Sequence, residues 1–381
     1  MKSFIVGVFT PSAHNTPYFR QCGNLMSGKP LEDWRSADDA AINGHLPIVR
    51  KLRTQEIHCT STGADRAALR NHSEVIQDLR AHGIHCTSDG ADYAAQGGHL
   101  ALIQDLRAHD IHCSSADFAA AAGHIETVRE LRSHGIHCTN DGPNHAARLG
   151  HLPMIQELRT YGLHCTSDGA NRAAGGGFLE IVRELREHDI HCTAEGANSA
   201  ARGGHLPVVH DLRAQGIHCS YAGANFAARN GQLAVVQDLN EHGIKCTSKG
   251  ANDAAGGGHL ELVQYLRGHD INCTFAGANN AAQGGHLNVV HDLREHDIHC
   301  TSSGANSAAQ SGHLHIVHDL RAHGIHCTSE GADKAAGGGH IAMIHDLRAH
   351  GIHCTSEGAD EAAEHGHMEI IHELRAHNIH C

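Results

Sequence analysis

A 27-residue period constrains this chain more than any other feature of its sequence. Cysteines stand at positions 59, 86, 113, 138, 165, 192, 219, 246, 273, 300, 327, 354 and 381, and every interval is 27 residues except Cys113 to Cys138, which is 25. A fixed period of this size is typical of stacked repeats, in which each repeat buries its apolar face against its neighbours. The period predicts a thirteen-unit array over residues 34–381, with residues 355–381 as a weak terminal cap. Residues 1–33 lie outside the repeat and are expected to form an N-terminal cap or arm.

Each repeat contains two segments with helical patterning. In the repeat that begins after Cys86, a short helix is expected over Gly90–Gln96 and a second over His99–His109. Leu100, Ile103 and Leu106 form one apolar stripe on the second helix. Aromatic residues make up only 3% of the chain, so the core must consist of Leu, Ile, Val and Ala, which suits small helical repeats better than a sandwich or barrel. The fold class predicted is all-α.

The repeat resembles the ankyrin family. Residues 200–212 read AARGGHLPVVHDL, which matches the Ala-Ala-x-x-Gly-His-Leu-x-x-Val-x-x-Leu signature of ankyrin repeats. The unit is shorter than the usual one of about 33 residues, because the hairpin-like loop is missing, and Gly-Ala-Asn or Gly-Ala-Asp replaces the usual Thr-Pro-Leu-His opening. The resemblance implies a right-handed α-solenoid of thirteen short ankyrin-like helix-turn-helix repeats that binds a protein partner. The missing loop argues against the loop-mediated docking of that family.

One position in the first helix varies between repeats without any packing pattern. It is the seventh residue after each cysteine, and Phe118 fills it in the 25-residue repeat. In ankyrin-like stacks the first helix lines the concave face. The variation therefore reflects either neutral drift on an exposed face or a surface that recognises a binding partner. The residues predicted to contact a partner are Tyr93, Phe118, Arg172, Phe226 and Lys334. No single catalytic constellation stands out, since thirteen copies of one Cys-His pair form an architectural pattern, and we expect a protein that is not an enzyme.

Histidine is unusually frequent, with 41 residues, and it is patterned. The histidine of Gly-His-Leu belongs to the ankyrin signature and is expected to be structural. A second cluster, His-x-x-His-Cys, ends most repeats and is not part of that signature. Alternate residues of an extended connection point to opposite sides, so Ile84 and Cys86 are expected to face inward and His85 outward. In-phase thiols one repeat apart are also too distant to be bridged, which predicts free cysteines.

Three interpretations of this cluster remain open. The simplest is a buried cysteine beside a solvated row of histidines. A second is a tetrahedral zinc or iron site completed by the adjacent repeat; no cofactor is required by the fold. The third is an array that loosens on acidification because stacked imidazoles repel one another below about pH 6. The candidate metal ligands are His82, His85, Cys86, His109, His112, Cys113, His323, His326, Cys327, His350, His353 and Cys354.

Charge and hydropathy narrow the expected partners. The net charge is −13 with neutral histidines, and the 29 Lys and Arg residues are spread along the repeats without a basic stripe, so a nucleic-acid partner is not expected. No apolar run reaches the length of about 20 residues that a membrane helix needs, so a membrane partner is not expected either. Without a convincing signal peptide, the expected location is the cytoplasm, or export without a classical signal. Because the array ends in phase with its repeat, head-to-tail self-association or an end-to-end filament is an alternative to partner binding.

Overall fold

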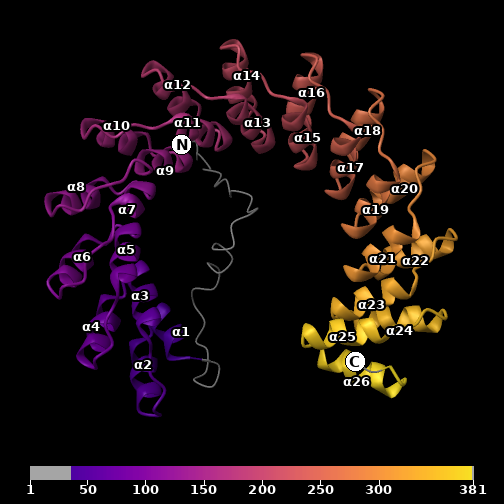
Figure 1. The fold of residues 1–381 in the computed structure, drawn as a ribbon, viewed down its shortest axis with the longest axis horizontal. Helices are drawn as coiled ribbons and strands as arrows, with labels where there is room; N and C mark the ends of the chain where they lie inside the picture. The colour runs from indigo at the N-terminus through magenta and orange to yellow at the C-terminus, as the bar shows by residue number, and fades with distance from the viewer. Residues whose placement is uncertain (1–35, 380–381) are drawn as a thin grey trace, which may run out of the picture. The chain divides into compact units, whose positions relative to one another are not determined.

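The computed structural model describes residues 36–379, and all regular structure within that range is α-helical (Figure 1). The all-α repeat fold predicted from the sequence is therefore confirmed. The described part of the chain holds 26 helices, two in each of thirteen successive segments. The predicted cap or arm over residues 1–33 and the last cysteine, Cys381, lie outside the described residues, so those two predictions stay as they are.

The described residues fall into two compact units, which divide after Gly90. The first unit contains α1 (Ala37–Ile42), α2 (Leu46–Arg53), α3 (Ser61–Leu69) and α4 (Ser73–Ala81), and α5 (Ser88–Gln96) spans the division between the units. The second unit contains α6 (Leu100–Arg107), α7 (Asp117–Ala121), α8 (Ile125–Ser133), α9 (Gly142–Leu149), α10 (Leu152–Thr160), α11 (Ser167–Gly175), α12 (Leu179–Glu187), α13 (Ala194–Gly203), α14 (Leu206–Ala214), α15 (Tyr221–Arg229), α16 (Leu233–Glu241), α17 (Ser248–Gly256), α18 (Leu260–Arg267), α19 (Phe275–Gln283), α20 (Leu287–Glu295), α21 (Ser302–Gln310), α22 (Leu314–Ala322), α23 (Ser329–Gly337), α24 (Ile341–Ala349), α25 (Ser356–Glu364) and α26 (Met368–Ala376).

Helix boundaries follow the residues that cap them. Thr193 precedes α13, and its side chain accepts a hydrogen bond from the amide of Glu195, which satisfies one of the free donors at a helix N-terminus. Gly204 ends α13 in the left-handed conformation, with φ of 80°, as expected for a glycine after a helix. The first helix of the repeat after Cys86 begins at Ser88, two residues before the expected Gly90, and the second helix, α6, is three residues shorter than expected over His99–His109. In the latter, His99 is the N-cap residue and the helix begins only after it.

Small side chains allow the odd-numbered helices to pack side by side. The Ala-Ala pair of each odd helix from α1 to α23 is almost fully buried, as at Ala227 and Ala228 in α15, and α15 packs against both α13 and α17. The even-numbered helices bury a stripe of larger residues, such as Val208, Val209 and Leu212 in α14. Every repeat therefore completes its core only by contact with its neighbours, as the repeat period predicts.

A side-chain clamp joins consecutive odd helices. In α11, the Asn171 amide oxygen accepts a hydrogen bond from the backbone N–H of Thr193 at 2.8 Å, and its amide nitrogen donates to the Thr193 hydroxyl at 3.0 Å. Asp65 forms the equivalent clamp in α3, where its carboxylate accepts hydrogen bonds from the backbone N–H and the hydroxyl of Thr87 at 2.7 and 2.8 Å. Each pair is separated by 22 residues, so the clamp fixes the register between one odd helix and the start of the next.

The Gly-His-Leu histidines are structural, as the sequence predicted. The ring of His286 occupies the space that a side chain on Gly258 would need, since an added Cβ would lie 2.5 Å from Nδ1. In the preceding repeat, His259 Nε2 lies 3.2 Å from the carbonyl oxygen of Arg229 and donates to it. The left-handed glycine and the histidine ring of the next repeat therefore form one packing unit, and Phe178 or Gln232 replaces the ring in two repeats.

Two glycines with the same backbone conformation allow this packing unit to be tested. Gly258 has φ of 76° and faces His286, whereas Gly243 has φ of 79° and no atom within 4 Å of an added Cβ. Gly243→Ala carries only the cost of a left-handed residue with a side chain, about 1 kcal/mol, whereas Gly258→Ala also displaces the ring, for a total of about 3 kcal/mol. Urea unfolding followed by the helix signal measures both, and equal losses would contradict the packing role.

Half-buried histidines such as His259 make stability depend on pH. Burial lowers the pKa of His259, the nearby His286 acts in the same direction, and the carbonyl of Arg229 acts in the opposite one. A folded-state pKa below the unfolded value means that the unfolded chain binds more protons, so stability is lost as pH falls below about 6.5. His259→Gln, a residue that occurs at the equivalent position 232, should lessen the loss of unfolding free energy between pH 7.5 and 5.5. An unchanged pH slope would show that His259 does not contribute to it.

Candidate binding surfaces

The five residues predicted to contact a partner all lie on odd-numbered helices. Phe118 in α7 and Phe226 in α15 are 42% and 44% exposed, and Tyr93 in α5 is half-buried. Arg172 in α11 pairs with Asp168 at 2.8 Å, and Lys334 in α23 pairs with Glu330 at 2.7 Å. These two charges are therefore balanced within their own helices, and the two phenylalanines are the stronger candidates for contact.

Phe226 borders an open cleft in the second unit. The cleft has a volume of about 320 Å³ and lies between α13 and α15, where it is lined by Glu195, Asn198, Ser199, Arg202 and Phe226. Phe226 forms an aromatic side of the cleft. Polar and charged side chains of α13 form the other side, where Glu195 and Arg202 are two helical turns apart. The cleft can therefore accept a side chain that has an apolar body and a polar end.

Two exposed aromatic residues escaped the sequence analysis. Tyr221 and Phe275 are the first residues of α15 and α19 and are 65% and 63% exposed. Both stand two residues after a repeat cysteine, where most repeats have serine. The sequence contained this signal, but only the seventh position after the cysteine was compared between repeats. Together with Phe226, they place three exposed aromatic rings on α15 and α19.

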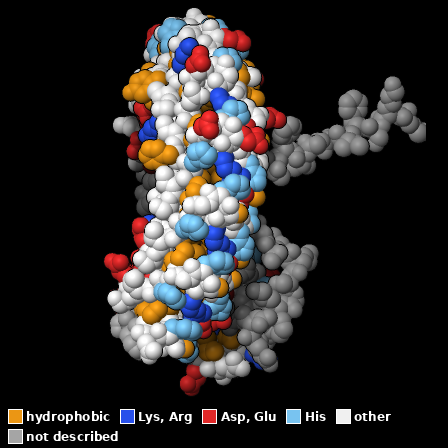
Figure 2. Space-filling model, turned by 90° about the vertical axis from the view of Figure 1, so that its right-hand side faces the viewer, with side chains coloured by type: hydrophobic (Ala, Val, Ile, Leu, Met, Phe, Trp, Pro, Cys, Tyr) orange, Lys and Arg blue, Asp and Glu red, His pale blue; other side chains and the backbone are white. Residues whose placement is uncertain are grey.

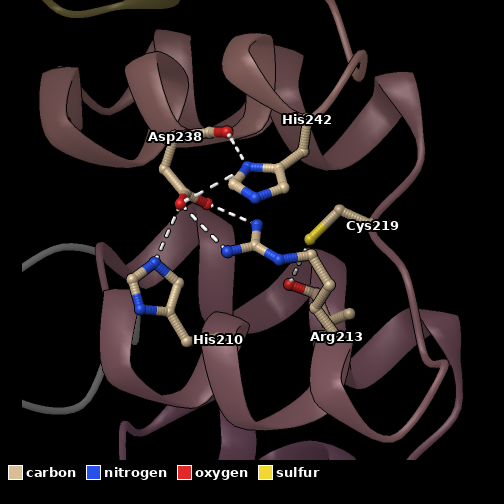
Figure 3. Close-up of polar contacts among 6 residues, drawn as sticks. His210, Arg213, Cys219, Asp238 and His242 are labelled. Atoms are coloured by element: carbon tan, nitrogen blue, oxygen red, sulfur yellow. Dashed lines mark hydrogen bonds and ion pairs between the residues drawn. The ribbon is translucent and has the colours of Figure 1, made fainter.

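A polar cluster lies between consecutive even-numbered helices, and Figure 3 shows it around Asp238. From α14, Arg213 donates to the Asp238 carboxylate through Nη1 at 2.6 Å and Nη2 at 3.0 Å, and His210 Nε2 lies 2.8 Å from Oδ1. Directly after α16, the C-cap residue His242 has its Nδ1 2.7 Å from the Asp238 carbonyl oxygen. Burial opposes the charge of Asp238 but is outweighed by the hydrogen bonds from Arg213 and His210, so its pKa is lowered.

The same pairing joins most even helices. Arginine from one repeat meets an aspartate or glutamate 25 residues later, as in Arg186 with Asp211 and Arg321 with Asp346. The junction between α16 and α18 differs, because Asn240 and Tyr265 take the two places and Asn240 Nδ2 donates to the Tyr265 hydroxyl at 3.1 Å. A neutral pair therefore replaces the ion pair between α16 and α18, and both partners change together.

The repeat cysteines from Cys59 to Cys354 are thiols with little reactivity, and all are buried except the half-buried Cys138. All cysteines from Cys59 to Cys354 are free, as predicted, and Cys219 Sγ donates to the carbonyl oxygen of Ala197 at 3.2 Å. Burial raises the pKa of Cys113 and Cys354 to about 12 and of Cys327 to about 11. The thiolate is the form of cysteine that acts as a nucleophile or binds a metal. A raised pKa keeps these cysteines as protonated thiols, which do not act in either way.

The candidate metal ligands do not converge. Cys86, Cys113, Cys327 and Cys354 are buried, whereas the histidines directly before them are exposed, which confirms that the connection directs cysteine inward and histidine outward. Within residues 36–379, no group of three or more His, Cys, Asp or Glu side chains is placed to hold a metal ion. The geometry therefore gives no support to a zinc or iron site at these residues, and that hypothesis stays a prediction for elemental analysis.

Among known proteins, this chain has a distant likeness to solved structures. No protein-family model matches it, and no curated protein does either. Among solved structures, it is similar to the pentatricopeptide repeat protein PPR10 in complex with an 18-nt psaJ RNA element, with 11% identity and a TM-score of 0.39 over 90% of this chain and 58% of that one. It is also similar to the pentatricopeptide repeat protein PPR10 from maize, with 10% identity and a TM-score of 0.30 over 88% of this chain and 66% of that one. This chain thus spans less than two-thirds of the length of PPR10, and its own family, ankyrin or another, stays a prediction.

The comparison corrects one expectation. A nucleic-acid partner was not expected from the net charge, but a similar structure holds an RNA element, so that exclusion was wrong. The physical reason is that a net charge summed over all repeats says nothing about the charge on one face of one repeat. For the membrane, the finding is limited to the described residues, none of whose helices is long and apolar enough to span a bilayer.

The Asp238 cluster gives a direct test of the ion-pair links. Asp238→Ala leaves Arg213 without its carboxylate in a partly buried place, which should lower the unfolding free energy by about 2 kcal/mol. Asp253→Ala is the matched control, because Asp253 has no ion pair among the described residues. Since the pKa of Asp238 is lowered, its stabilisation is present above about pH 4 and is lost as pH falls further. Urea titrations should therefore show a smaller difference between Asp238→Ala and the unchanged chain at pH 3 than at pH 7.

Proposed function

We propose that this chain is a non-enzymatic scaffold that binds a protein partner on the exposed face of its odd-numbered helices. The cleft beside Phe226 is the observation that carries the proposal. Buried aromatic anchors supply much of the binding energy of protein interfaces, and Phe226, Tyr221 and Phe275 remain exposed in a chain that has few aromatic residues. Glu195 and Arg202 beside Phe226 supply the polar contacts that surround such anchors.

The proposal that the chain is not an enzyme is supported by the environment of its Cys-His pairs. A Cys-His pair acts as a nucleophile and base only when the thiol has a low pKa and the two groups are close. Here burial raises the pKa of Cys219 to about 11, and its sulfur donates to a backbone carbonyl. The neighbouring His218 is exposed on the other side of the connection. Head-to-tail self-association stays a prediction beside partner binding.

Site-specific photo-crosslinking tests the proposed surface. A benzophenone amino acid replaces Phe226 in the full chain, and the matched control carries it at Ser307, the equivalent position of α21. We expect a cross-linked product at position 226 that protease destroys and ribonuclease leaves intact, and much less of it at position 307. Once the partner is identified, Phe226→Ser should weaken binding at least tenfold without changing the helix signal. A product that ribonuclease removes, or equal products at both positions, would contradict the proposal.

A further inference from the structure

The cleft beside Phe226 has a charged side chain at each end. Glu195 and Arg202 are seven residues apart on α13, both line the cleft and both are exposed. At 1.5 Å per residue, their positions are about 10 Å apart along the helix. Within residues 36–379, neither side chain has an ion pair. The cleft therefore has a negative end and a positive end, and the ring of Phe226 lies beside them.

Charged side chains on α11 and α14, which both pack against α13, do not neutralise these ends because they already pair elsewhere. The pairs are Asp168 with Arg172, Arg186 with Asp211, and Arg213 with Asp238, at 2.8, 2.6 and 2.6 Å. Any compensation for Glu195 and Arg202 must therefore come from the next odd helices or from a bound partner.

The register between odd helices places Arg202 beside Phe226. Gly256 occupies the repeat position of Arg202 two repeats later, and a Cβ added to Gly256 would lie 3.0 Å from the Cβ of Asn280. Asn280 stands at the repeat position of Phe226, so these two positions are neighbours across each junction of odd helices. The guanidinium of Arg202 can therefore reach a group that rests on the Phe226 ring.

The charges of α15 and α17 leave both ends of the cleft open. Arg229 on α15 is exposed, and the same register places it beside the half-buried Asp253 of α17, which offsets its charge. Lys249 on α17 stands two repeats after Glu195 at the equivalent position. At 8–10 Å between packed helices, it is about 16–20 Å from Glu195, which is beyond the screening length of about 8 Å at physiological salt.

The even-numbered helices present a different surface. Figure 2 draws the side on which Figure 1 places α20, α22 and α24, and histidine and basic side chains alternate there with hydrophobic ones dispersed among them. At the cleft, by contrast, a ring that is 44% exposed lies beside a carboxylate and a guanidinium that have no ion pairs. The cleft therefore offers an apolar contact and two opposite charges to one ligand.

We infer that the cleft binds a segment of the partner protein in which an apolar residue lies between a basic and an acidic residue, each two positions away. The apolar side chain packs on Phe226, the basic one pairs with Glu195, and the acidic one pairs with Arg202, whose guanidinium binds carboxylates through two parallel hydrogen bonds. The inference rests on the proposed function, since it specifies the chemistry of the partner at the same cleft.

The dimensions of the cleft fit an extended segment. Its volume of about 320 Å³ has room for one large side chain, whereas a helix with its side chains is about 10 Å across. In an extended chain, alternate side chains share a face, and residues four apart are separated by about 13 Å. Flexible basic and acidic side chains cover the difference from the distance of about 10 Å between the two ends. Both chain directions allow this pairing.

Three fluorescein-labelled peptides test the inference on the full chain at pH 7.5. They are GKSWSEG with one charge of each sign, the dibasic GKSWSKG and the diacidic GESWSEG. Fluorescence anisotropy should show about fivefold tighter binding of GKSWSEG than of either other peptide, because each of those loses one ion pair and places like charges together. The chain has a net charge of −13, so the dibasic peptide would bind most tightly if overall charge alone decided.

Charge reversals locate the contacts. Arg202→Glu should move the preference to the dibasic peptide, and Glu195→Arg should move it to the diacidic one. The matched controls Arg148→Glu and Glu357→Arg make the same changes at the equivalent, exposed positions of α9 and α25. Both controls should keep the preference for GKSWSEG, and the helix signal should be the same in all four variants.

Several results would overturn the inference. Equal affinity for the three peptides, no binding of any of them, or equal shifts in the control variants would each do so. Tighter binding of a ten-nucleotide single-stranded RNA that depends on Phe226 would assign the cleft to nucleic acid instead. Self-association that Phe226→Ser abolishes would assign it to a second copy of the chain. A protein cross-linked at position 226 without any charge preference among the peptides would overturn this inference and leave the proposed function standing.

Discussion

Hydrogen bonds between neighbouring repeats hold this structure in register. On the odd-numbered helices, an Asn or Asp side chain binds the start of the next odd helix 22 residues later, as Asn171 does with Thr193. On the even-numbered helices, an arginine binds a carboxylate 25 residues later, as Arg213 does with Asp238. Apolar burial brings repeats together but leaves their relative position free to slide, whereas paired polar groups penalise any shift that leaves them unmatched.

The short repeat shows how these links constrain the chain. Two residues are missing between Cys113 and Cys138, yet Asp92 still binds Ser114 and Asp117 still binds Thr139, each at a spacing of 22 residues. The loss therefore falls between Ser114 and Asp117, and α7 has only five residues where most odd helices have nine. The first turn of one helix is given up while both links around it are kept. Phe118 stays on the exposed face of that shortened helix.

The sequence predicted the repeats better than the surfaces between them. The cysteine period and the Leu100, Ile103 and Leu106 stripe identified two helices per repeat, and alternation along the connection predicted buried Cys86 beside exposed His85. The carboxylate clusters were not predicted, because Arg213 and Asp238 are 25 residues apart and only the stacking of helices brings them together. Tyr221 and Phe275 were missed for another reason, because they stand at the second position after the cysteine and only the seventh was compared between repeats.

The uniform spacing of the links has a consequence for how the array can change in length. On the even-numbered helices, most repeats of 27 residues carry a carboxylate that accepts from the arginine of the repeat before. They also carry an arginine that donates to the carboxylate of the repeat after. Excision or duplication of a whole repeat therefore leaves the flanking junctions with complementary groups. The junction of Asn240 with Tyr265 is the exception, because separating these two repeats would pair asparagine with an aspartate or glutamate and tyrosine with an arginine. Gene rearrangements that add or remove repeats should be tolerated everywhere else more readily than between α16 and α18.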